Sequence, residues 1–223
     1  MPPRSSSRLT SWTPSQTWPE LDLVEETVAL RDGTLSVLRP RDSDALLDEQ
    51  AFEREEFLPY WAEVWPSGAA LARRVSARAL RGAHTLELGC GLGLPSLAAA
   101  LAGGRVLATD WSPDAIELLG ENARRNGVAL ETALLDWRTP AAVIERGPWN
   151  LVLAADVLYE RHNVLLMLDL LPRLVDARGE VWIADPGRPA AAEFLERADR
   201  RWERSSEADG AVTVHRLRAA QAA

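Results

Sequence analysis

The chain of 223 residues is poor in cysteine and in long apolar runs. Its single cysteine, Cys90, excludes a disulfide within the chain, so a cytoplasmic location is expected. No run of about 18 apolar residues is present, which predicts no membrane-spanning helix. Residues 1–7 lack the apolar segment of a secretory signal. The three histidines lie far apart, without neighbours at ligand spacing, so no metal site is expected.

Basic residues are also in deficit. The chain has 25 basic against 33 acidic residues and a net charge of −8, which argues against a nucleic-acid or anionic membrane partner. Apolar residues make up 47% and charged residues 26%, as in ordinary globular proteins. The length fits one main domain with a small appendage.

Composition divides the chain into three parts. Residues 1–20 are rich in Ser, Pro and Thr, which predicts a mobile N-terminal segment. Residues 21–57 are predicted to form a β-hairpin around Asp32-Gly33, followed by an acidic helix. The acidic stretch 41–63 is either a solvated helix face or a lip that attracts a cationic substrate. The main domain is predicted over residues 58–223.

In the main domain, strand patterns alternate with helix patterns. This alternation predicts an α/β fold with a mainly parallel sheet and helices on both faces. Asp209-Gly210 lies between two short apolar segments and predicts a C-terminal antiparallel hairpin. We expect Ser67 to cap a helix over 69–80. The other expected strands are 84–88, 105–109, 129–134, 150–155 and 179–184, and the other expected helices are 94–102, 113–125, 160–177 and 190–200.

The turn after the first of these strands has a glycine at every second position, at Gly89, Gly91 and Gly93. Such a turn allows a ligand to approach the backbone closely. It has no G-K-[ST] and no side chain that would bind phosphate, and its third glycine comes one residue too early for a dinucleotide fingerprint. Glu87 precedes the turn and would repel phosphate but bind an ammonium group. The turn therefore favours a nucleoside that carries an amino acid.

Each of the five strands is followed, or ended, by an acid. Helix capping explains one such acid, but not five together. Ligands of open α/β sheets bind at this carboxyl edge. Asp110 is expected to hold a ribose diol, Asp136 to accept from an adenine amine, and Trp111 or Trp137 to stack on the base. The five acids are Glu87, Asp110, Asp136, Asp156 and Asp185.

The segment Glu87-x-Gly89-x-Gly91-x-Gly93 resembles motif I of class I S-adenosylmethionine-dependent methyltransferases. Residues 60–68 resemble the aromatic segment that precedes motif I in the lysine-methyltransferase branch, and Asp156-Val157-Leu158-Tyr159 resembles its D-x-x-Y motif. Residues 185–189 resemble the D-P-G-R segment of electron-transfer-flavoprotein β-subunit lysine methyltransferases and of bacterial nicotinamide N-methylase-like proteins. The resemblance covers about residues 57–189 and implies a Rossmann-like, seven-stranded sheet.

The resemblance further implies S-adenosylmethionine as methyl donor and a lysine ε-amine as acceptor. The acceptor lysine would belong to a partner protein, such as the electron-transfer flavoprotein β subunit. Asp156 and Tyr159 are the predicted catalytic residues, which hydrogen-bond and orient the amine. The predicted cofactor-binding residues are Trp65, Glu87, Gly89, Gly91, Gly93, Asp110, Trp111, Asp136, Trp137 and Ala155.

Three other functions remain open from the sequence. A small-molecule N-methyltransferase acting on a pyridine or an amine would share every cofactor residue and differ only at the rim. A non-catalytic cofactor-binding interaction protein is disfavoured by the intact glycine turn and its acids. A nicotinamide-dependent oxidoreductase is disfavoured by Leu94 and Glu87. Neither the identity of the acceptor nor the oligomeric state can be read from the sequence.

Overall fold

The computed structural model describes residues 22–46 and 60–220. The predicted segment 1–20 lies outside these residues, as does most of the acidic stretch. Between them, β1 (Leu23–Ala29) and β2 (Thr34–Pro40) form an antiparallel hairpin. Gly33 lies in its turn with φ 116°, which confirms the Asp32-Gly33 hairpin prediction. Of the predicted acidic helix, the described part forms only the short 3-10 helix η1 (Asp44–Leu46).

The main sheet has seven strands in the order β5-β4-β3-β6-β7-β9-β8. The first five of these are parallel, and the last two form the predicted antiparallel hairpin against β7. The strand order reverses between β3 and β6, so the switch point lies where these two strands end. The strands are β3 (His84–Leu88), β4 (Arg105–Asp110), β5 (Glu131–Leu134), β6 (Trp149–Ala155), β7 (Val175–Asp185), β8 (Trp202–Asp209) and β9 (Val212–Ala219).

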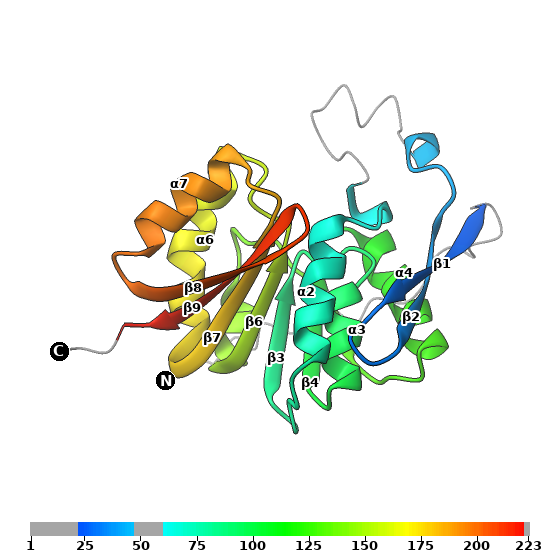
Figure 1. Ribbon diagram of the computed structural model, residues 1–223, viewed down its shortest axis with the longest axis horizontal. Helices are drawn as coiled ribbons and strands as arrows, with labels where there is room; N and C mark the ends of the chain where they lie inside the picture. Colours follow the sequence, from blue (N-terminus) through cyan, green and yellow to red (C-terminus); the bar gives the residue numbers. More distant parts are fainter. Residues whose placement is uncertain (1–21, 47–59, 221–223) are drawn as a thin grey trace, which may run out of the picture.

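Helices cover both faces of the sheet (Figure 1). Alternate residues of the central strand β6 enter two separate cores: Leu151 and Leu153 join one, and Val152 and Ala154 join the other. This alternation is the period-two pattern of a strand that is buried on both faces. The first face carries α2 (Pro66–Ser76), α3 (Leu94–Leu101) and α4 (Pro113–Arg125), and the second carries α5 (Ala141–Glu145), α6 (Arg161–Leu174) and α7 (Pro189–Ala198).

Three helix predictions are corrected. The helix α2 begins at Pro66 rather than at residue 69, because Pro at the first helical position has a suitable φ and needs no N–H partner. Ser67 therefore lies inside the helix and does not cap it, and the N-cap residue is Trp65. The five-residue α5 was not predicted, and α6 ends at Leu174, three residues earlier than expected, where the extended β7 begins.

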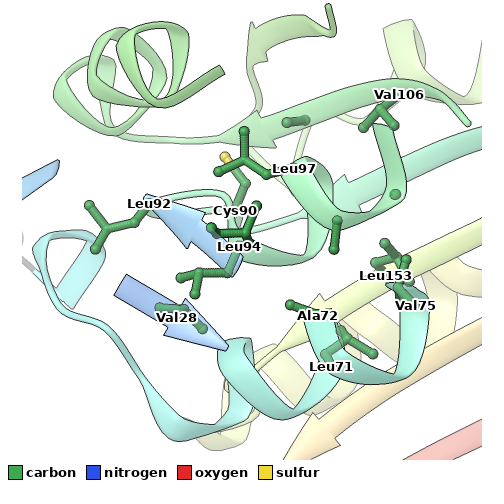
Figure 2. Packing of buried hydrophobic residues seen from close by; sticks show 14 of the residues in the cluster. Val28, Leu71, Ala72, Val75, Cys90, Leu92, Leu94, Leu97, Val106 and Leu153 are labelled. Atoms are coloured by element: carbon green, nitrogen blue, oxygen red, sulfur yellow. The ribbon is translucent and has the colours of Figure 1, made fainter. Parts of the chain in front are cut away.

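The N-terminal hairpin shares the first core with the sheet. Val28, Leu35 and Val37 are buried together with residues of α2 and α3. Figure 2 shows Val28 of β1 in one cluster with Leu94 of α3 and with Leu71 and Ala72 of α2. The hairpin is thus part of the packed body, and its burial contributes to the same hydrophobic stabilisation as the helices.

Two asparagines of the α4 region hold the open edge of β2. Asn122 accepts from the Leu38 N–H (2.7 Å) and donates to its carbonyl (3.2 Å). Asn126 makes the same pair of bonds to Ser36 (3.0 and 2.7 Å). These amides take the place of a neighbouring strand and satisfy the edge. Asn122 also donates to the Leu92 carbonyl (3.4 Å) and so links the hairpin to the glycine turn.

Candidate active site

The glycine turn connects the end of β3 to the start of α3 at the switch point. All three glycines have positive φ, with values of 67° at Gly89, 49° at Gly91 and 81° at Gly93. A Cβ on Gly93 would lie 2.1 Å from the Leu119 side chain, so α4 packs directly against this residue. Non-glycine residues avoid this backbone conformation. The spacing of the glycines is therefore set both by the backbone and by packing.

Two tryptophans lie against the turn from outside. A Cβ on Gly89 would lie 3.4 Å from the Trp137 ring, and one on Gly91 would lie 3.1 Å from the Trp61 carbonyl oxygen. Trp61 belongs to the 3-10 helix η2 (Tyr60–Ala62), which thus contacts the turn. The structure places the predicted residue Trp137 at the site. The contribution of the Trp61 backbone was not predicted, because no pattern in the sequence signals it.

Two buried acids lie under the turn. Asp110 is 5% exposed, and its carboxylate oxygens accept from the N–H groups of Gly91 (2.9 Å) and Ser112 (2.9 Å). The Trp111 N–H also bonds this carboxylate, and the three donors leave at least one acceptor position for a ligand. Glu87 is 1% exposed, and its Oε2 accepts from the Ser96 hydroxyl. Glu87 Oε1 has no partner among the described residues.

Burial governs the ionisation of both acids. It raises the pKa of Glu87 to about 8, although the hydrogen bonds from Ser96 act in the opposite direction. Burial also raises the pKa of Asp110, against the N–H donors of Ser112 and Gly91. A buried carboxylate without a full set of partners is costly. A cationic group that reached Glu87 Oε1 would therefore gain a strong, charge-assisted contact.

The structure gives Asp136 a partner that the sequence did not suggest. Its carboxylate accepts from Arg138 Nε at 3.0 and 2.9 Å, and the Arg138 contact lowers its pKa. Asp136 would therefore share its oxygens between Arg138 and any adenine amine. Trp111 follows β4 directly and is 42% exposed, which leaves part of the residue accessible to a base. The assigned roles of both residues stay predictions.

Three aromatic side chains contact one another beside the loop that carries Asp156. The rings of Tyr60 and Tyr159 meet edge to face with centroids 5.5 Å apart, and Tyr60 meets Trp65 at 6.2 Å. Trp65 Nε1 donates to the Tyr60 carbonyl (2.6 Å). Tyr60 and Tyr159 are 44% and 41% exposed. Burial, and then the nearby charges of Glu160 and Asp110, raise the pKa of Tyr159.

Asp156 follows β6 directly after Ala155 and has φ 58°, one of two positive values among the described non-glycine residues. Such a backbone is strained and is commonly found at functional sites. Its side chain is 7% exposed, and Oδ1 accepts from Arg188 Nε at 2.6 Å. Oδ2 lies 3.4 Å from the hydroxyl of Ser67 in the first turn of α2. Neither partner of Asp156 was predicted, because 32 and 89 residues separate them from it.

The loop after β7 holds Arg188 in place. Asp185 is 2% exposed, and its Oδ1 accepts from the N–H groups of Gly187 (2.6 Å) and Arg188 (2.7 Å). Its Oδ2 has no partner among the described residues. Gly187 has φ 92°, which the tight turn requires. The D-P-G-R segment is thus a compact turn that presents one guanidinium to Asp156.

The described residues contain no group of three or more metal-ligating side chains. Within those same ranges, no helix is long and apolar enough to span a membrane.

A family model described as lysine methyltransferase matches residues 55–201. The electron transfer flavoprotein beta subunit lysine methyltransferase of Xenopus laevis is 37% identical over 135 residues, which cover 58% of this chain and 53% of that protein. EEF1A lysine methyltransferase 3 of Mus musculus is 32% identical over 132 residues, which cover 57% of this chain and 56% of that protein. The chain thus spans about half the length of these relatives.

Solved structures share the fold. The T. thermophilus 16S rRNA N2 G1207 methyltransferase, in complex with AdoMet and guanosine, superposes with a TM-score of 0.67 at 13% identity, covering 93% of this chain and 53% of that one. At this identity the likeness shows the architecture alone. It confirms the predicted Rossmann-like sheet with its antiparallel C-terminal hairpin.

Proposed function

The chain belongs to the lysine methyltransferase family, and we propose that it transfers a methyl group from S-adenosylmethionine to the ε-amine of a lysine in a partner protein. One observation carries the proposal. The family match, residues 55–201, spans the glycine turn, the acids under it and the mouth formed by Asp156, Tyr159 and Arg188. The proposed acceptor class rests on this match and on the two lysine methyltransferase relatives.

The residues at the glycine turn fit the proposed cofactor. Glu87 Oε1 is a buried acceptor without a partner among the described residues, which suits the ammonium of the amino-acid part. Asp110 keeps an acceptor position for a ribose diol, and a Cβ at Gly89 or Gly91 would press on Val157 or on the Trp61 carbonyl at 3.1 Å. When bound, the cofactor supplies a methyl group whose bond to sulfur breaks, with the electron pair on sulfur, as the acceptor nitrogen bonds to carbon.

The residues around Asp156 have to bind a lysine ammonium and allow it to lose a proton while it stays bound. A free lysine amine has a pKa of about 10.4, so it must lose a proton before it can act as a nucleophile. In the proposed mechanism Asp156 hydrogen-bonds the amine and directs its lone pair, as Tyr159 does from the same loop between β6 and α6. The aromatic walls of Tyr60, Tyr159 and Trp65 favour the neutral amine by desolvation. Alignment of the two reactants supplies much of the rate.

The test uses labelled S-adenosylmethionine with a cell lysate, and with purified electron-transfer flavoprotein β subunit as a defined acceptor. The chain contains no lysine, so any labelled lysine belongs to another protein. We expect Asp156→Ala to lose transfer to protein lysine by at least about a hundredfold. Its cofactor affinity, measured by calorimetry, should stay unchanged.

Three results would contradict the proposal or a part of it. Label found only in small molecules would assign the chain to the small-molecule N-methyltransferases. Full turnover by Asp156→Ala would remove Asp156 from the acceptor site. Absence of both transfer and cofactor binding in the unmodified protein would leave the glycine turn without its proposed ligand and would overturn the function as a whole.

A further inference from the structure

The acceptor mouth has an unusual balance of charge. Two buried carboxylates, Asp156 and Asp185, lie at the ends of neighbouring parallel strands, and one guanidinium, that of Arg188, lies with them. Mutual repulsion with Asp156 contributes to the raised pKa of Asp185, after burial. The Asp156 carboxylate in turn raises the pKa of Arg188, which stays charged. With both acids ionised the group has a net charge of −1, and one bound ammonium would neutralise it.

The contact between Arg188 and Asp156 leaves acceptor positions on Asp156 for such an ammonium. The pair with Asp156 runs through Nε alone, so the two-pronged contact that arginine commonly makes with a carboxylate is absent here. The Arg188 side chain is 35% exposed, so part of it stays accessible to solvent and to a ligand. Asp156 keeps further lone pairs, since its Oδ2 makes only a long contact with Ser67.

A nearby fixed cation changes the chemistry of an amine bound at Asp156. Two carboxylates without Arg188 would hold an ammonium tightly and raise its pKa, because opposite charges favour the charged form. The amine would then stay protonated and could not attack. A guanidinium beside the same carboxylate opposes both effects, since like charges within a few ångströms disfavour the protonated amine. The charged or titratable groups at this mouth are Asp156, Asp185, Arg188, Tyr159, Glu160, Tyr60 and Asp110.

We propose that Arg188 is a positioning residue that holds Asp156 through Nε. Its positive charge weakens the attraction of the bound acceptor ammonium to the two carboxylates, so that this ammonium can lose its proton. The proposal rests on the proposed function, since it concerns the same acceptor site. The proposal predicts opposite changes in amine binding and in the rate of methylation. Removing the guanidinium should tighten the binding of the amine and slow its methylation, whereas a residue that only stabilises the loop would weaken both.

The first experiment uses the unmodified cofactor-free protein and n-butylammonium, a mimic of the lysine side chain. We expect Arg188→Met to lower the dissociation constant of n-butylammonium at pH 7 by about tenfold. It should also raise the pKa of the bound amine, followed by NMR. Arg188→Lys keeps the cation and should return the constant toward that of the unmodified protein. Arg173→Met is the matched control, because it removes an arginine from a surface pair with Asp169 on α6.

The second experiment measures methyl transfer to the acceptor found with the labelled cofactor. For Arg188→Met we expect a lower KM for the acceptor, a lower kcat and a pH optimum about one unit higher. Urea unfolding confirms that the variant is folded. Weaker or unchanged n-butylammonium binding in folded Arg188→Met overturns the proposal. If the unmodified protein transfers no methyl group, the function fails, but the binding experiment still tests the charge effect of Arg188.

Discussion

Glu87 offers a direct test of how burial acts on the site. Glu87 is 1% exposed under the glycine turn, and its carboxyl group accepts hydrogen bonds from the hydroxyl and the backbone N–H of Ser96. Burial raises its pKa from 4.5 to about 8. The folded cofactor-free protein therefore keeps this group protonated over a pH range in which the unfolded chain ionises it. Replacing Glu87 with Gln keeps the shape and removes the titration.

The sign of the effect follows from proton counting. Between pH 4.5 and about 8 the folded state binds the Glu87 proton and the unfolded state has lost it, so stability falls as the pH rises. While the two states differ by one full proton, each pH unit lowers the free energy of unfolding by about 1.4 kcal/mol, which gives about 4 kcal/mol between pH 5 and pH 8. The lowered pKa values of His84 and His215 add their own pH dependence. That dependence is common to both proteins and cancels in the comparison.

The assay is urea unfolding of the unmodified protein and of Glu87→Gln from pH 5 to pH 8.5. We expect the Gln variant to gain stability relative to the unmodified protein steadily across this range, by about 4 kcal/mol in total. Glu196→Gln, at an exposed position of α7, is the control and should give parallel curves. Parallel curves for Glu87→Gln would refute the reasoning, because they would mean that Glu87 is ionised in the folded protein.

Two further predictions concern the packing around the glycine turn. Gly93→Ala should lower the free energy of unfolding in urea by about 2–4 kcal/mol, because its Cβ would lie 2.1 Å from Leu119 at a φ of 81°. Adding Leu119→Ala to the same chain should recover part of that loss. A Gly93→Ala variant of unchanged stability would contradict this prediction. Asn122→Ala should lower the free energy of unfolding by about 2–3 kcal/mol and should also weaken cofactor binding in calorimetry, because Asn122 bonds the Leu92 carbonyl. Asn126 has no such bond, so Asn126→Ala should leave cofactor binding unchanged. Equal effects of the two variants on cofactor binding would contradict a role for the Asn122–Leu92 bond.

Much of the fold could be predicted because its signals are local. The strands 84–88 and the helix 113–125 have the predicted bounds. Buried parallel strands appear as apolar runs, and Asp-Gly pairs mark both hairpins. The predictions were wrong where tertiary contacts determine the start of a helix or the partner of a side chain. The start of α2 moved to Pro66, and Ser67 changed from an expected cap to a neighbour of Asp156.

The candidate site was predictable as a set of residues but not as a set of pairs. A rule for open α/β sheets brings strand-end acids to one edge, and the structure places Asp110, Asp156 and Asp185 there. Which cation meets which acid depends on side-chain directions in loops. Arg138 was not expected on Asp136, nor Arg188 on Asp156. These two pairs alter the expected roles of both acids, since each now shares its oxygens with a guanidinium.

The buried acids at the carboxyl edge of the sheet lower the stability of the fold but suit the proposed reaction. Glu87, Asp110 and Asp185 are each at most 5% exposed, and burial raises the pKa of all three. Carboxyl groups in such positions lower stability, and sites of this kind persist where function needs them. Both proposed ligands are cations that would supply the missing partners. Their binding should therefore stabilise the fold through these acids as well as through the contacts that any bound ligand makes.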